Sequence, residues 1–349
     1  MMKRRDFLKY FSSIPLVGSL GLPRYAVAQE PPPGEFSQGW TPNPRVTEEF
    51  SQALPKIYGE QVEQLVEQDD NKDALLWRPL TLCLKKAGLE SRWLKKRDGK
   101  DCVRAYAQLN VGSCTGNATA QAINVLGAVE IVLLDKFQEF KTICSAEGIY
   151  GLGRETANML RSPGDGCYGS AMAKAVMEMG TIYCLKYGDV DLTEYDPIRC
   201  RRFGDAGVGE ALKIEAKKHP VQSTVRVRDA ASAWSLLGNG YPINVCSNVG
   251  FKTPRDADGV CRPSGTWNHS MAVIARRTTQ SGNRIFILLN SWGDDWNSGP
   301  YWADMPWGSF GVEFGVFDRM CKQGDTFAYS ELEGFVPQSL DDFGTKEYL

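Results

Sequence analysis

The chain has 349 residues, enough for one large two-lobed domain or two modest ones, and long enough to bury a core without disulfides or metals. Its 40 Lys and Arg residues nearly balance 42 Asp and Glu residues, so charge gives no reason to expect nucleic acid or an anionic membrane as a partner. No interior run approaches the roughly 18 consecutive apolar residues that a membrane span requires.

Residues 1–28 have the order of a removable export signal. The basic run Lys3-Arg4-Arg5 precedes a short apolar stretch that ends in Ala26-Val27-Ala28. The paired arginines followed by Phe-Leu-Lys resemble the twin-arginine class, which predicts the twin-arginine export machinery as a partner and a periplasmic or extracellular location. An ordinary secretory signal or a retained anchor is the alternative. Cleavage after Ala28 would leave no membrane anchor.

Two segments follow the export signal. Residues 29–46 contain the run Pro31-Pro32-Pro33-Gly34 among further Pro, Asn and Ser, a composition that indicates a linker. Residues 47–100 have a charged, helical pattern. This pattern fits either a prosegment that covers a cleft or an N-terminal extension packed on the main domain, and it does not distinguish the two.

The rest of the chain predicts helices first and strands afterwards. Apolar residues are dense enough from 114 to 140 for a helix that is buried over most of its surface, and a second helix is predicted over 170–180. Strands are predicted over 243–246, 271–275 and 285–289. This order is typical of an α+β protein with segregated halves.

Histidine is scarce, because only His219 and His269 are present, and this limits the chemistry available. The ten cysteines include no pair at C-x-x-C spacing and no neighbouring histidine that would complete a zinc site. We therefore expect no structural metal and no cofactor. The pairing of the cysteines cannot be predicted from their spacing.

Cys114 is the strongest candidate for a reactive group. A thiol attacks a carbonyl carbon well only as the thiolate, and the unpaired N–H groups at a helix start favour that anion. His269 can supply an imidazolium beside it, since the pair Asn268-His269 is expected to open a strand and to project into a cleft. His219 lies in a charged turn and is most simply a solvated surface residue.

Two further side chains fit the same chemistry. Asn290 ends the predicted strand 285–289, where a hairpin would bring its amide oxygen to a ring N–H of His269. The side-chain amide of Gln108 and the backbone N–H of Cys114 are candidate donors to the oxyanion that forms during hydrolysis.

These residues fall in three blocks: "QLNVGSCTGNA", the pair Asn268-His269, and "LLNSWGDDW". The blocks resemble the catalytic blocks of the papain-like cysteine peptidases, in the same order. The resemblance covers roughly residues 101–335 and leaves residues 336–349 as a C-terminal tail. It implies an α+β, two-lobed fold in which a helical lobe is followed by an antiparallel β-barrel-like lobe, with the active site in the cleft between them.

The resemblance also implies a role for each site residue. Trp292 would shield the contact between the orienting residue and the base from water. Cys114 would be the nucleophile and His269 the general base and acid. Asn290 would orient His269, and Gln108 would donate to the oxyanion.

The stretch Pro163–Ser170 resembles the glycine-rich loop that binds the substrate backbone in this family. Gly166 and Gly169 would permit that close approach, although a plain turn before a helix is nearly as good an explanation. Thr115 departs from the aromatic residue that usually follows the nucleophile. The end of the domain, with its insertions rich in Pro, Trp and Gly, resembles bacterial and phage-type members.

The sequence thus predicts an exported cysteine peptidase that hydrolyses a peptide or protein substrate through a thioester. Two other functions stay open. The first is a non-catalytic papain-fold binding protein with an inert Cys114, and the second is an amidase or peptidoglycan peptide hydrolase that uses the same three residues.

Overall fold

The computed structural model describes residues 39–133, 139–338 and 340. The predicted export signal, the linker up to residue 38 and the tail beyond residue 340 therefore lie outside the described residues. Among the helices in the described ranges, none combines the length and the apolar character that a membrane crossing requires.

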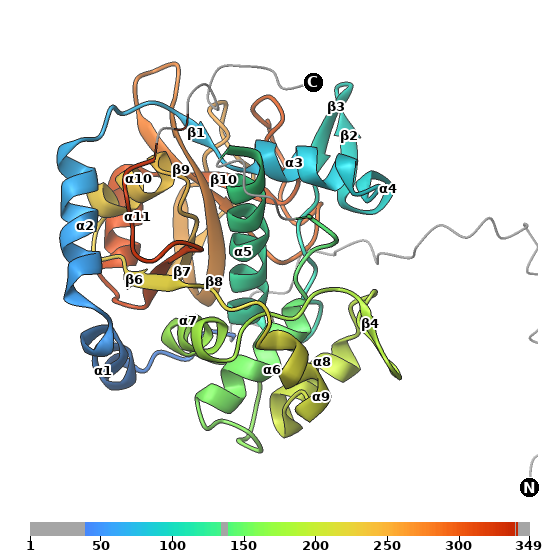
Figure 1. Cartoon of the computed structure of the whole chain (residues 1–349). Coiled ribbons are helices and arrows are strands. Elements are labelled where there is room, and N and C mark those ends of the chain that lie inside the picture. The colour runs from blue at the N-terminus through green and yellow to red at the C-terminus, as the bar shows by residue number, and fades with distance from the viewer. Residues whose placement is uncertain (1–38, 134–138, 339, 341–349) are drawn as a thin grey trace, which may run out of the picture.

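The described residues form eleven helices and eleven strands (Figure 1). The helices are α1 (Pro44–Ala53), α2 (Lys56–Glu67), α3 (Trp77–Lys86), α4 (Glu90–Trp93), α5 (Cys114–Leu133), α6 (Ala146–Thr156), α7 (Gly169–Glu178), α8 (Pro197–Ala206), α9 (Glu210–Ala216), α10 (Ala230–Gly238) and α11 (Phe314–Cys321). The strands are β1 (Ala74–Leu75), β2 (Leu94–Arg97), β3 (Lys100–Val103), β4 (Lys186–Tyr187), β5 (Val190–Asp191), β6 (Ser223–Arg226), β7 (Ile243–Phe251), β8 (Pro263–Thr278), β9 (Arg284–Leu289), β10 (Ser309–Glu313) and β11 (Thr326–Ser330).

One antiparallel sheet dominates the second half of the chain. Its strand order is β10-β9-β8-β7-β11-β6, and β1 also pairs with β8. The α+β prediction, with a helical region followed by an antiparallel sheet, is confirmed. The expectation that Asn268-His269 opens a strand is wrong, because β8 begins at Pro263 and already pairs there with Phe251 of β7.

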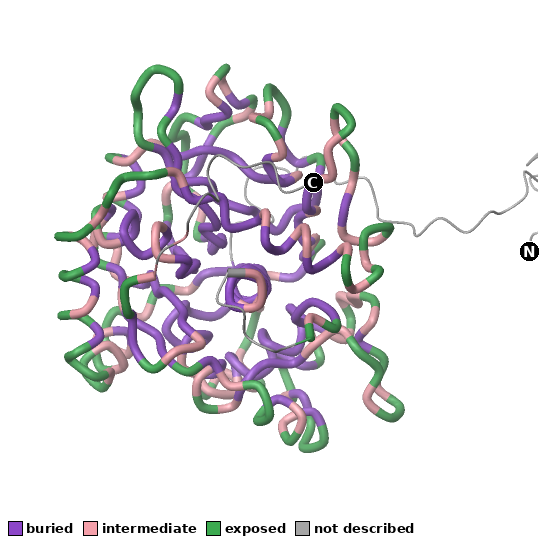
Figure 2. The backbone as a smooth tube through the Cα atoms, turned by 45° about the horizontal axis from the view of Figure 1, so that its top comes forward, coloured by how far each residue is buried: buried purple, intermediate pink, exposed green. Residues whose placement is uncertain are grey.

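Helix α5 lies between the sheet and α6, and it is buried along most of its length (Figures 1 and 2). Polar side chains on this helix fix the adjoining loops. Gln121 accepts a hydrogen bond from the backbone N–H of Tyr106 at 3.0 Å and donates to the carbonyl oxygen of Asn290 at 3.4 Å. The helix therefore positions both the segment before Cys114 and the end of β9.

The N-terminal arm, which we define as residues 39–104, is built into the fold. The predicted linker, residues 29–46, does not hold for its described part, because Trp40 is buried and α1 begins at Pro44. Farther along the arm, α3 packs against α5 with Trp77 fully buried. Figure 1 shows the arm passing from α1 and α2 on one side of the molecule, through β1, to α3 beside α5.

Candidate active site

Cys114 is the first residue of α5, as the sequence predicted, and its side chain is fully buried. Burial raises the pKa of the thiol to about 12, although the backbone N–H groups of Ser270 and Thr115 donate to the sulfur and oppose this shift. The hydrogen bond from Ser270 places the sulfur beside the residue that follows His269 in β8.

His269 is also fully buried and forms the predicted pair with Asn290. Its Nε2 lies 2.7 Å from Oδ1 of Asn290. Because an amide oxygen can only accept, Nε2 must carry the proton, and Nδ1 is left as the basic nitrogen. In the described part of the chain Nδ1 has no hydrogen-bond partner. Burial lowers the pKa of His269 to about 4, and the bond to Asn290 partly offsets this.

Trp292 lies against the ring of His269, as the resemblance to the papain-like peptidases implies. Its ring centroid lies 4.5 Å from that of His269, with the two planes 31° apart. Trp267 and Trp296 pack edge-on against Trp292 at 4.9 and 5.4 Å. These three rings pack around the imidazole of His269.

The side-chain amide of Gln108 is held near Asn290 by hydrogen bonds at both its oxygen and its nitrogen. Its Oε1 accepts a hydrogen bond from Ser291 Oγ at 2.6 Å, and its Nε2 donates to the carbonyl oxygen of Val111 at 2.9 Å. Ser291 directly follows Asn290, so Gln108 lies next to the His269–Asn290 pair. Cys114 is linked to the same strand by the hydrogen bond from Ser270, which follows His269. One hydrogen of Nε2 remains beyond the bond to Val111.

A second thiol, Cys246, lies near the site on β7. It is paired in register with Ser270, whose hydroxyl accepts from its Sγ at 3.3 Å. Side chains alternate along a strand, so Cys246 and Ser270 share one face of the sheet while His269 projects to the other. Cys246 also lacks the helix N-terminus that Cys114 has. His219, the other histidine, is exposed and meets Tyr183 edge-on at 5.0 Å.

In the glycine-rich loop, the backbone amides of both predicted glycines are bonded within the protein. The N–H of Gly166 donates to the hydroxyl of Tyr150, and the N–H of Gly169 donates to Asp325 at 2.6 Å, so neither amide faces a substrate. Cys167, between the two, presents its backbone instead: its N–H donates to the carbonyl oxygen of Gly39 at 3.0 Å, and its carbonyl oxygen accepts from Thr41 at 2.9 Å.

The N-terminal arm itself covers the site. Besides its two bonds to Cys167, it donates the N–H of Trp40 to the carbonyl oxygen of Asn268 at 3.1 Å. Residues 39–41 therefore span from the glycine-rich loop to the strand that carries His269. The sequence analysis did not identify Trp40, Cys167 or Asp325, although a lone tryptophan inside a polar, proline-rich stretch was a signal that could have been used.

Within residues 39–133, 139–338 and 340, no group of three or more His, Cys, Asp or Glu side chains is arranged to hold an ion.

The comparisons with known proteins bear on the fold alone. No protein family model matches the sequence, and no curated protein matches it. Among solved structures, xylellain, a cysteine protease from Xylella fastidiosa, matches with a TM-score of 0.51 and 16% identity over 85% of this chain and 97% of its own. Procathepsin B from Trypanosoma congolense matches at 0.43 and 12% identity, over 84% and 83%. Bromelain from Ananas comosus matches at 0.42 and 14% identity, over 65% and 92%.

The fold and the grouping of cysteine, histidine and asparagine define a class, that of two-lobed α+β proteins with a thiol at a helix start. Within that class, the match to xylellain shows the papain-like cysteine protease fold.

Proposed function

We propose that the chain is an exported cysteine peptidase that hydrolyses peptide bonds through a thioester acyl-enzyme. One observation carries the proposal: the 2.7 Å bond from Nε2 of His269 to Asn290 leaves Nδ1 as the basic nitrogen, and the next residue, Ser270, donates its backbone N–H to the thiol at the start of α5. The basic, apolar and small residues of positions 1–28 support the export part, with a periplasmic or extracellular location and the twin-arginine machinery as partner.

In the acylation step, Nδ1 of His269 takes the proton of Cys114 and the sulfur attacks the substrate carbonyl carbon. A carbon–sulfur bond forms, and the carbonyl electron pair moves to the oxygen. The backbone N–H of Cys114 and the free hydrogen of Gln108 Nε2 stabilise that oxyanion. The proton on Nδ1 then passes to the leaving nitrogen, the carbon–nitrogen bond breaks, and the thioester remains.

In the deacylation step, Nδ1 removes a proton from water and the resulting hydroxide attacks the thioester carbon. The second oxyanion collapses, the carbon–sulfur bond breaks, and the acid product departs. Cys114 leaves as the thiolate and takes the proton back from Nδ1, which restores the starting pair. Asn290 holds the ring by Nε2 through both steps, so the same nitrogen accepts and returns each proton. Its neutral amide does so without adding a buried charge.

Trapping of the acyl-enzyme tests this proposal. The full chain and its Trp40→Ala variant, in which the covering segment is loosened, are mixed with an activated peptide ester, quenched in acid and mapped by mass spectrometry. We expect one acyl group on Cys114. An acyl group on Cys246, or no covalent adduct in either protein, would contradict the proposed mechanism and favour a binding protein.

Gln108→Ala is expected to lower kcat by about 10²–10³, the usual loss for one oxyanion donor. KM should change little, because the bond strengthens as charge develops on the oxygen. Steady-state kinetics on a fluorogenic peptide measure both constants. The matched control is Ser291→Ala, which removes the partner of Gln108 Oε1 and retains the donor; a loss as large as that of Gln108→Ala would argue that the amide acts only through packing.

A further inference from the structure

The backbone N–H of Ser270 reaches the sulfur of Cys114 where β9 comes to an end. The last residue of β9 is Leu289, which lies opposite Ala272 of β8. In the part of the chain that the structure describes, the pairing of the two strands stops there. The N–H of Ser270, two residues from Ala272, donates to the sulfur instead. Such a donor stabilises a thiolate more than a neutral thiol, because hydrogen bonds to charged groups are the stronger ones.

A row of buried side chains holds Ser270 in place. Its hydroxyl donates to Oδ1 of Asn244 on β7 at 2.5 Å. Nδ2 of the same amide donates to the hydroxyl of Thr119 on α5 at 2.7 Å. We call Thr119, Asn244 and Ser270 the polar link, and each is at most 1% exposed. The polar link joins the strand that carries His269 with the helix that begins at Cys114.

The strand register explains why Asn244 can reach the hydroxyl of Ser270. Asn244 pairs with Ala272 and Cys246 pairs with Ser270, so Asn244 and Ser270 are diagonal neighbours on one face of the sheet. Cys246 also donates to the hydroxyl of Ser270, at 3.3 Å. A thiol is a weak donor, so the bond to Asn244 is the stronger of the two holds.

Apolar packing alone would not fix the amide of Ser270 as closely. Many of the side chains between α5 and the sheet are apolar, and contacts of that kind have no preferred direction. A hydrogen bond requires a narrow range of distance and angle, and a buried polar group that loses its partner is costly. The sheet therefore cannot slide along α5 without breaking a bond of the polar link.

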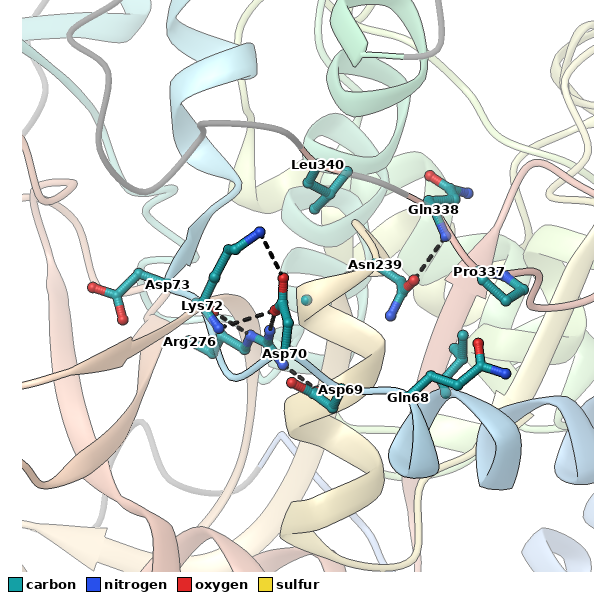
Figure 3. A pocket seen from close by; sticks show the side chains of 12 residues that line it. Gln68, Asp69, Asp70, Lys72, Asp73, Asn239, Arg276, Pro337, Gln338 and Leu340 are labelled. Carbon is teal, nitrogen blue, oxygen red and sulfur yellow. Dashed lines mark hydrogen bonds and ion pairs between the residues drawn. The ribbon is translucent and has the colours of Figure 1, made fainter.

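The other end of β8 is held by different contacts. Figure 3 shows Arg276 of β8 beside Asp69 and Asp70 of the turn that follows α2. The guanidinium pairs with Asp69, donates from Nη2 to Asp70 at 3.3 Å, and donates from Nε to the carbonyl oxygen of Lys72 at 2.8 Å. These contacts tie β8 to the N-terminal arm, whereas the polar link ties the part of β8 at Ser270 to α5.

We propose that Thr119 and Asn244 are positioning residues, which hold the backbone N–H of Ser270 against Cys114 so that it stabilises the thiolate. This inference rests on the proposed function, because a nucleophilic thiol is the group that needs such a donor. It gives the second turn of α5 and the strand β7 a part in the reaction, although the bonds of Thr119 and Asn244 go to each other and to Ser270.

The test measures how fast iodoacetamide labels Cys114 at pH 7.5, located by mass spectrometry. All proteins are full-length and carry Trp40→Ala, because residues 39–41 lie across the site. Thr119→Val replaces a hydroxyl by a methyl group, and Ser270→Ala removes a hydroxyl and keeps the backbone N–H. We expect each to slow labelling about three- to tenfold, since tenfold corresponds to a rise of one in the pKa of the thiol. A general loosening of the site has the opposite sign, because it exposes the thiol and speeds labelling.

Two further variants separate the polar link from other effects. Thr119→Ser keeps the hydroxyl and should restore the labelling rate of the parent protein. Tyr329→Phe removes another fully buried hydroxyl, which lies 3.3 Å from that of Thr119 but outside the polar link, and should label as the parent does. Circular dichroism shows whether each variant is folded. If Thr119→Val is not, Ser270→Ala and Tyr329→Phe decide the question.

Unchanged or faster labelling in either folded variant, Thr119→Val or Ser270→Ala, would overturn the positioning role, since the polar link requires both. An equal slowing in Tyr329→Phe would overturn it as well. Hydrolysis of a fluorogenic peptide by the parent protein is measured separately. Hydrolysis together with unchanged labelling rates would count against the polar link alone. Slower labelling in the two variants of a parent that cleaves no peptide would support the polar link and count against the peptidase.

Discussion

Cys114→Ala is expected to lower kcat/KM for peptide hydrolysis by about 10⁴–10⁶, the largest effect predicted for any single side chain. The alanine variant cannot form the thioester, and residual turnover would come only from substrate binding and the oxyanion donors. The measurement is made in the Trp40→Ala background, because residues 39–41 lie across the site in the structure. A fluorogenic peptide in excess over enzyme gives kcat/KM from initial rates.

Cys246→Ala is the matched control, since it removes a thiol that is equally buried and lies near the same strand. It should retain turnover within a few-fold. His269→Ala should lose about as much as Cys114→Ala, and the double variant should lose little more, because the two residues act as one unit. Full activity in Cys114→Ala, or its loss only in Cys246→Ala, would reassign the nucleophile.

Arg276→Leu is expected to lower the free energy of unfolding by about 3–5 kcal/mol, the usual cost of removing one partner of a buried ion pair. Asp69, whose side chain is 7% exposed, would be left as an uncompensated buried carboxylate. The carbonyl oxygens of Lys72 and Trp234 would lose their donors as well. Guanidinium chloride unfolding followed by circular dichroism measures the change in midpoint and slope.

Asp70→Asn provides the comparison, because Asp70 contacts the same guanidinium from a position 53% exposed. Its expected cost is within about 1 kcal/mol, as for other solvated ion pairs. Similar losses for Arg276→Leu and Asp70→Asn would mean that the turn after α2 is held by something other than the buried pair.

The sequence was most informative where the chemistry depends on local order. A helix starting at Cys114 follows from a run of apolar residues, and the contact of His269 with Asn290 follows from two strands joined by a hairpin. Both features are present in the structure. The catalytic roles of these residues remain predictions, because geometry alone does not report turnover.

The sequence was least informative where distant segments meet. Trp40 and Asp325 are 285 residues apart, and no periodicity or spacing relates them. The same holds for Arg276. A charged side chain within a strand predicts a surface position, but in the structure the turn at Asp69 buries it. The linker prediction failed for a related reason. It relied on the average composition of residues 29–46, which is poor in apolar residues, whereas the single residue Trp40 is buried.

Residues 39–41, which lie across the site, are joined to α1 by only two residues, Pro42 and Asn43, and this short tether has a consequence for competition. A segment held so close to its binding site has an effective concentration in the millimolar range that dilution of the protein does not change. A peptide that competes for the same space must therefore be present at a high concentration relative to its own dissociation constant before it reaches Cys114. A weakly bound or scarce peptide would then fail to displace residues 39–41, whereas an abundant or tightly bound one would displace them.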